Sequence, residues 1–158
     1  MEPKPERNQK TLSSTETFQS GLSNPNLGFV SRTMLAELMD EDINVRRGAA
    51  QTLGDLGKST EEIQSALIVA LEDRDRLVRF AAAGALMRVG KDSEPVLRAL
   101  LYLLTDSEEM VCVGATLALV ALLHDSQKAV NTFRELLAQE SEEVRFSASH
   151  FSDLLAAW

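Results

Sequence analysis

The sequence repeats itself with a period of 33 residues over most of its length, and this period restricts the chain to a few architectures. The segment Leu38–Ala50 aligns with Leu71–Ala83 at nearly every small or apolar position. Two more copies follow at the same offset, from Leu104 and from Leu137, with no insertion or deletion. Four copies in phase predict a row of similar units, each of which buries its apolar face against its neighbours.

Within each unit, apolar residues recur twice with helical spacing. Offsets of 3, 4, 7, 8 and 11 residues place those of the first segment on one broad face of an α-helix, and a second segment has a similar face. Aromatic residues make up only 5% of the chain, which also favours closely packed helices. The sequence therefore predicts an all-α fold of helical hairpins. The apolar positions of one first helix are Val78, Ala81, Ala82, Ala85, Leu86 and Val89, and those of one second helix are Ile63, Ala66, Leu67, Ala70 and Leu71.

The residues between the apolar segments fit helix ends. Ser59 followed by Glu62 predicts a capping box, and Gly57 and Gly90 stand where a left-handed residue would close the preceding helix. The expected N-cap residues are Asp42, Asp75 and Ser141. Small residues near the start of each first helix predict close approach of neighbouring hairpins. These small pairs are Gly48-Ala49, Ala81-Ala82, Gly114-Ala115 and Ser147-Ala148.

The first 30 residues differ from the rest in composition. They are mostly polar, contain a Ser/Thr-rich stretch and three of the four prolines, and show no apolar period. We expect residues 1–30 to be a disordered tail and residues 31–158 to be the repeat array. Just before the first helix, Leu27, Phe29 and Val30 form a small apolar group that can fold back as a lid on the end of the array.

The formal net charge of −8 belongs entirely to the repeat region, because acidic and basic residues balance within residues 1–30. An acidic surface repels phosphate backbones and anionic lipid head groups, so neither nucleic acid nor a membrane is an expected partner. No apolar run approaches the length of about 20 residues that a bilayer crossing needs. The single cysteine, Cys112, permits no internal disulfide, and the N-terminus has no apolar segment typical of a secretory signal. We expect a cytoplasmic protein.

The turn and helix start of each unit resemble the short HEAT repeats named after phycobilisome lyase subunits, whose signature is Asp-x-Asp-x-x-Val-Arg-x-x-Ala-Ala. The segments Asp40–Ala50 and Asp73–Ala83 match this signature closely. The resemblance implies a right-handed α-solenoid of about 3.5 HEAT-like repeats of 33 residues. It also implies a ladder across the turns, in which Asp40, Asp73 and Asp106 pair with Arg46 and Arg79. Cys112 stands where the next arginine is expected, so the ladder should be broken there.

The chain offers little for catalysis. Its two histidines, His124 and His150, are 26 residues apart in sequence, and the repeated His-Glu pairs of di-iron HEAT-like enzymes are absent. Acidic pairs such as Glu61-Glu62 stand at helix N-termini, where they favour the helix dipole. We expect no enzyme, no metal and no cofactor. The alternative is a subunit of a phycobilin-lyase-type or other enzyme complex.

The expected function is therefore that of a protein-interaction module or adaptor. In arrays of this family the second helices usually line the concave side, and by resemblance this side would bind the partner. Leu97, Leu101 and Tyr102 give the middle second helix more apolar surface than one core face needs. Whether they are exposed or covered by neighbouring helices is left open by the sequence. The candidate partner-binding residues are Gln64, Ile68, Leu97, Arg98, Leu101, Tyr102, Asn131 and Arg134.

The two ends of the predicted array are unequal. It starts with a helix of the second kind near residues 32–39 and ends with a helix of the first kind over residues 142–158. Terminal units of such arrays normally carry a polar outer face, yet this last helix is rich in large apolar residues. Either it caps the stack, or the chain meets a partner or its own copy there, so we expect self-association through the C-terminal helix as one option. The residues concerned are Phe146, Phe151, Leu154, Leu155 and Trp158.

Overall fold

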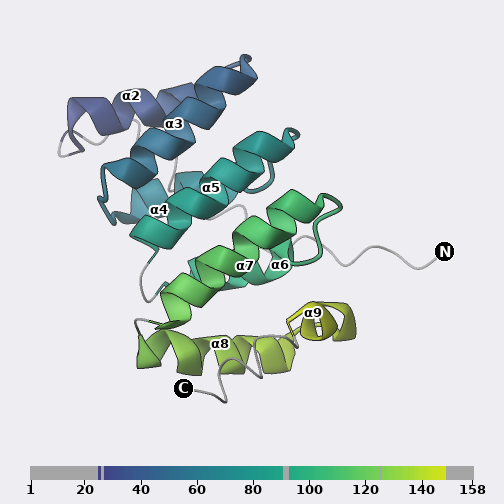
Figure 1. Ribbon diagram of the computed structural model, residues 1–158. Helices are drawn as coiled ribbons and strands as arrows, with labels where there is room; N and C mark the ends of the chain where they lie inside the picture. The colour runs from purple at the N-terminus through teal and green to yellow at the C-terminus, as the bar shows by residue number, and fades with distance from the viewer. Residues whose placement is uncertain (1–24, 26, 91–92, 125, 149–158) are drawn as a thin grey trace.

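The computed structural model describes residues 25, 27–90, 93–124 and 126–148, which form eight α-helices and no strand (Figure 1). None of the described helices is long and apolar enough to cross a membrane. The helices are α2 (Phe29–Glu37), α3 (Ile43–Asp55), α4 (Glu61–Ala70), α5 (Arg76–Val89), α6 (Glu94–Leu103), α7 (Glu109–His124), α8 (Gln127–Gln139) and α9 (Glu142–Ser147).

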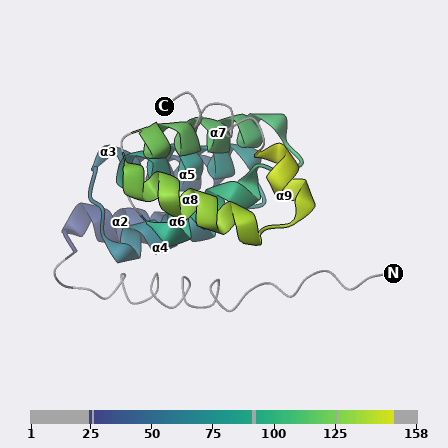
Figure 2. The same ribbon diagram turned by 90° about the horizontal axis from the view of Figure 1, so that it is seen from below.

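The helices lie in two layers, which are seen edge-on in Figure 2. The first helices of the hairpins, α3, α5 and α7, pack side by side in one layer, and α2, α4, α6 and α8 form the other. Each second helix also packs against the first helix of the next hairpin, as α4 does against α5 and α6 against α7. The prediction of an all-α solenoid of helical hairpins is confirmed.

The core lies between the two layers and follows the predicted apolar stripes. Leu67 of α4, Leu86 of α5 and Leu119 of α7 are completely buried. Small residues let the first helices approach closely, because a β-carbon on Gly54 would stand 2.8 Å from the Ala85 Cα and one on Gly114 would stand 2.8 Å from the Phe80 ring. At Gly48, by contrast, a β-carbon would have no neighbour within 4 Å. Close packing was expected there too, and the structure leaves that place open.

Most of the predicted helix ends are confirmed. The side chains of Asp42, Asp75 and Ser141 accept backbone N–H groups of the helices that follow them. Gly57 has a φ of 61°, the left-handed conformation that favours glycine.

Two of the predicted ends are wrong. The N-cap of α4 is Thr60, and the Ser59 hydroxyl instead donates a hydrogen bond of 2.6 Å to the carbonyl of Val89 in the next repeat. Gly90 has a φ of −93°, so no left-handed turn requires it. It is needed for space, because a β-carbon there would stand 2.6 Å from the Leu86 carbonyl oxygen.

The described array begins inside the segment that we expected to be a tail. Leu27 is buried, and α2 begins at Phe29. The predicted apolar lid is wrong for Phe29 and Val30, because both side chains are exposed in the first turn of α2. Residues 1–24 of the expected tail, and Phe151, Leu154, Leu155 and Trp158 of the expected last helix, lie outside the described residues.

Candidate functional site

The second-helix layer holds the residues that we expected to bind a partner, and two of them are core residues. Leu101 is 0% exposed and Leu97 is also fully buried, so neither belongs to a binding surface. The physical reason is the position of α6 in the middle of its layer, where it packs against α4, α7 and α8. On α6 these three neighbours together cover more than one apolar stripe. The option that neighbouring helices cover these leucines is therefore the correct one.

The remaining predicted residues give this layer a mostly polar surface. Tyr102 is 68% exposed, and Asn131 and Arg134 are exposed on α8. Ile68 packs partly against the core. The Gln64 amide donates hydrogen bonds to the Ser59 hydroxyl and the Val89 carbonyl, so it joins consecutive repeats.

Arg98 links α6 to the end of α8. Its guanidinium lies 3.1 Å from the Glu94 carboxylate and 3.7 Å from that of Glu140. Two carboxylates of the same chain thus already engage this side chain. Among the predicted partner-binding residues, Tyr102 is the large apolar one that remains exposed.

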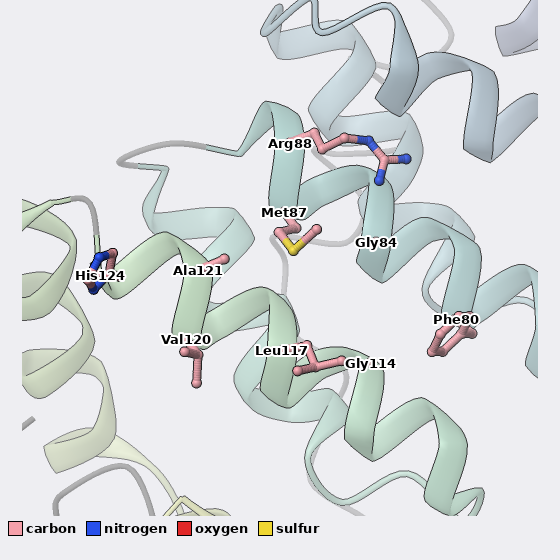
Figure 3. Close-up of a pocket in the computed structure, with 9 residues that line it drawn as sticks. All are labelled: Phe80, Gly84, Met87, Arg88, Gly114, Leu117, Val120, Ala121 and His124. Carbon is pink, nitrogen blue, oxygen red and sulfur yellow. The ribbon is translucent and has the colours of Figure 1, made fainter. Parts of the chain in front are cut away.

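A groove with a volume of about 630 Å³ lies on the other layer, between α5 and α7 (Figure 3). Leu117 is 57% exposed along it. Phe80 marks one end, and Arg88 and His124 lie toward the other (Figure 3). The groove is lined by Phe80, Gly84, Met87 and Arg88 of α5 and by Gly114, Leu117, Val120, Ala121 and His124 of α7.

The groove exists because small residues alternate with large ones on the outer side of these helices. Gly84 has open space where a side chain would stand. The Phe80 ring leans onto Gly114 and leaves the space beyond it free, while Met87 and Leu117 form the walls. Of the nine lining residues only Arg88 carries a permanent charge, and it lies 3.3 Å from the Asp55 carboxylate.

The sequence contains a signal for this groove that the predicted apolar stripes do not include. The segment from Met110 to Leu123 has no charged residue, so α7 is apolar on all sides. In the first repeat, the positions equivalent to Phe80 and Leu117 hold Arg47 and Gln51. Both positions are thus polar in the first repeat, which lacks this apolar outer surface.

The ladder between repeats is present and serves structure. The Arg46 guanidinium donates to both carboxylate oxygens of Asp73, at 2.7 and 3.0 Å, and Arg79 binds Asp106 in the same way at 2.9 and 3.0 Å. The hydrogen bond to Asp73 raises the pKa of Arg46. The expectation is wrong for Asp40, whose carboxylate accepts the backbone N–H of Asp42 and meets no arginine side chain in the described part of the chain.

Cys112 breaks the ladder, as expected. Its thiol donates to the main-chain carbonyl of Asp106 at 3.1 Å, which is the backbone contact that Arg46 and Arg79 make in their own turns. Burial, with a smaller effect of the Asp106 carboxylate, raises the pKa of the thiol. A protonated thiol is a poor nucleophile, so this environment does not activate Cys112.

Metal and acid–base chemistry have little support among the residues that the structure describes. No group of three or more His, Cys, Asp or Glu side chains there is arranged to hold a metal ion. His124 is exposed at the end of α7, and His150 lies outside the described residues.

The comparison with family models agrees with the architecture. A model described as HEAT repeats matches residues 31–120, which is more than half of the chain. The chain belongs to the HEAT-repeat family. HEAT repeats generally mediate protein–protein interaction, and the fold is typically non-enzymatic. The match does not single out the short phycobilisome-lyase variety of HEAT repeat. A comparison with curated proteins gave no match.

Proposed function

We propose that this HEAT array is a non-catalytic protein-interaction module and that the groove between α5 and α7 is its main contact surface. The observation that supports the proposal is the contiguous apolar surface of the groove, where Leu117 is more than half exposed. Contiguous exposed apolar surface on a soluble protein marks interaction sites. Covering it would contribute about 25 cal/mol for each Å² removed from water.

The chemistry of the lining defines the partner segment. Phe80, Met87, Leu117 and Val120 favour an apolar segment, such as one face of an amphipathic helix. The Arg88 guanidinium pairs with Asp55 of α3, so it leaves the lining of the groove without an unpaired charge. We therefore expect the partner to present an apolar stripe.

The second-helix layer is a second surface for the same function. Tyr102 is a large exposed residue of its middle helix, α6, and tyrosine is enriched among residues that dominate binding energy. Asn131 and Arg134 are exposed in the same layer. This layer is the side that HEAT arrays usually present to partners, so the experiment must compare both surfaces.

A photo-crosslinking side chain placed at position 117, 102 or 51 in living cells tests the proposal. Position 51 is the matched control, because Gln51 occupies the same place in the first repeat as Leu117 does in the third and is also exposed. We expect position 117 to form a covalent adduct with a protein other than this chain and position 51 to form no such adduct. Adducts from position 102 alone would move the site to the second-helix layer. No adduct from any position would contradict the proposed function.

The substitution Leu117→Gln then measures what the groove contributes, because it gives the third repeat the residue of the first. We expect this change to weaken capture of the crosslinked protein by about tenfold or more, since a well-packed anchor contributes about 1–2 kcal/mol or more. Gln51→Leu is the reciprocal control and should leave capture unchanged. Both residues are exposed, so the melting temperature should stay within about 2 °C in both variants.

A further inference from the structure

The two ends of the array carry complementary halves of one repeat interface, and this suggests how two copies of the chain meet. The helices α2 and α9 lie at opposite ends of the array (Figure 1). The helix α2 is of the second kind and α9 is of the first kind, as the 33-residue period shows. We call the open sides of α2 and α3 the head face and the open side of α9 the tail face.

The head face exposes a position whose equivalents in all later repeats are buried. Val30 of α2 is 49% exposed, whereas its equivalents Ile63, Val96 and Ala129 are 0% exposed. The helices α4, α6 and α8 each belong to a hairpin with a first helix, and no described helix takes that place beside α2. A first helix supplied from outside would bury Val30.

An apolar residue on the tail face matches an open place on the head face. Phe146 of α9 is 78% exposed, and it is the equivalent of Phe80, two repeats earlier. The Phe80 ring packs onto Gly114 of the next first helix. In the same register Gly48 is the equivalent of Gly114, and the space over Gly48 is empty. Phe146 of one copy over Gly48 of another would repeat the contact between Phe80 and Gly114.

The charges at the two ends match in the same register. Arg46 and Arg79 each pair with the aspartate that lies 27 residues later in sequence. Arg145 is their exposed equivalent on the tail face, and no described carboxylate pairs with it. Asp40 is the equivalent of Asp73 and Asp106 on the head face. Its carboxylate already accepts the backbone N–H two residues later, as the other two aspartates do, and lacks only the arginine.

We propose that two copies of the chain stack head to tail, with α9 of one copy packed on α2 and α3 of the next. Arg145 then pairs with Asp40 across the junction, and Phe146 covers Gly48. The solenoid continues through the junction with its own 33-residue period. Because the interface joins two different surfaces, further copies can add to both ends, and the assembly grows as a filament unless it closes into a ring.

The N-terminal segment of the same chain is a poorer occupant of the head face. In the repeat register, Ser13 and Ser14 take the positions that hold Arg79 and Phe80 in the second complete repeat. They offer neither a guanidinium for Asp40 nor a ring for Gly48. Arg145 and Phe146 offer both, so a second copy is the better occupant. The groove between α5 and α7 takes no part in the junction, so this proposal stands independently of the proposed function.

Sedimentation velocity of the full chain over a range of concentrations tests the junction. We expect the wild-type chain to form species larger than its own 17.4 kDa as concentration rises. Asp40→Arg and Arg145→Asp each place like charges across the junction, so each should raise the concentration for half association by about tenfold or more. A one-to-one mixture of these two variants should associate again, because every junction then contains opposite charges.

Two further variants separate this interface from others. Gly48→Leu fills the space over α3, where a β-carbon has no neighbour within 4 Å, so the variant should stay folded but lose association. Arg134→Asp makes the same charge change as Arg145→Asp at an exposed site on α8 and should associate like wild type. A wild-type chain that remains a single copy up to its solubility limit would overturn the proposal. So would association that is unchanged by Gly48→Leu, or a mixture of charge variants that fails to recover.

Discussion

Two arginines join consecutive repeats with the same set of contacts. Arg46 binds the Asp73 carboxylate of the next turn and also donates to the main-chain carbonyls of Asp40 and Glu41 in its own turn. Arg79 repeats these contacts one unit later. Each side chain therefore fixes the shape of one turn and the distance to the next. These two Arg–Asp ion pairs, the rungs of the ladder, are largely buried. Each arginine therefore loses hydrogen bonds to water, which its protein partners must replace.

Replacing Arg46 should therefore cost far more stability than replacing an exposed arginine nearby. Arg46→Ala leaves the Asp73 carboxylate without its guanidinium in a largely buried place, and we expect a loss of about 3 kcal/mol or more in the free energy of unfolding. Arg76→Ala removes an exposed pair with Glu108 at 3.2 Å and should cost less than about 1 kcal/mol. Urea unfolding of both variants measures the difference. Equal losses would show that the ladder contributes no more than a surface ion pair.

The helices α6 and α7 show why part of the candidate site escaped prediction from sequence. Both carry more apolar residues than one stripe needs. The helix α6 buries the excess, including Leu97 and Leu101, because α4, α7 and α8 surround it. The helix α7 exposes its excess, including Leu117, on the outer side of its layer. The helix α7 also packs against three helices, α5, α6 and α8, but they leave its outer side open. Composition predicts how much apolar surface a helix has, whereas the sides on which its neighbours pack decide which part is covered.

The repeat signals that were predicted correctly are local ones. Asp42 and Asp75 cap their helices because the cap needs only residues within the next turn. The N-cap of α4 was predicted wrongly, because it is Thr60 and not Ser59, and the cause is not local. The Ser59 hydroxyl is engaged by Val89, which is 30 residues away in sequence, so a contact between repeats overrides the local capping pattern.

Adjacent residues of α6 should behave in opposite ways when truncated. Leu101 is completely buried, so Leu101→Ala should destabilise the array by about 2–5 kcal/mol and lower its melting temperature by several degrees. Tyr102→Ala removes an exposed ring and should change stability by no more than about 0.5 kcal/mol. Leu67→Ala is the buried control from the neighbouring second helix. Thermal melts followed by circular dichroism compare the three variants, and a Tyr102 variant that melts like the Leu101 variant would place Tyr102 in the core.

At the scale of the whole molecule, stability in a solenoid is a sum of repeat terms and nearest-neighbour terms. The 33-residue period predicted that the hairpins stack. It did not predict that the contacts between consecutive repeats, and the stability they contribute, differ along the array. The two ladder rungs join the turns before α3, α5 and α7 to one another. Farther along the chain, Cys112 replaces the ladder arginine. Gln139, the last residue of α8, stands where the earlier repeats have the ladder aspartate, which lies in a turn there. The connection between α8 and α9 within the chain therefore lacks an Arg–Asp rung.

This uneven coupling predicts the order in which the helices open. The helix α5 packs against both α3 and α7, and both rungs meet at its N-terminal end, so its amides should exchange most slowly with deuterium. The amides of α9 should exchange fastest among the described helices, because no rung ties that helix to the array. Arg79→Ala removes the second rung and should speed exchange in α7 and α8 more than in α3, whereas Arg76→Ala should leave the order unchanged. Hydrogen exchange measured by mass spectrometry, at a concentration where the chain is a single copy, tests this. If every helix exchanged at one common rate in the wild type and in Arg79→Ala, the array would open only as a whole, and the ladder would not divide it.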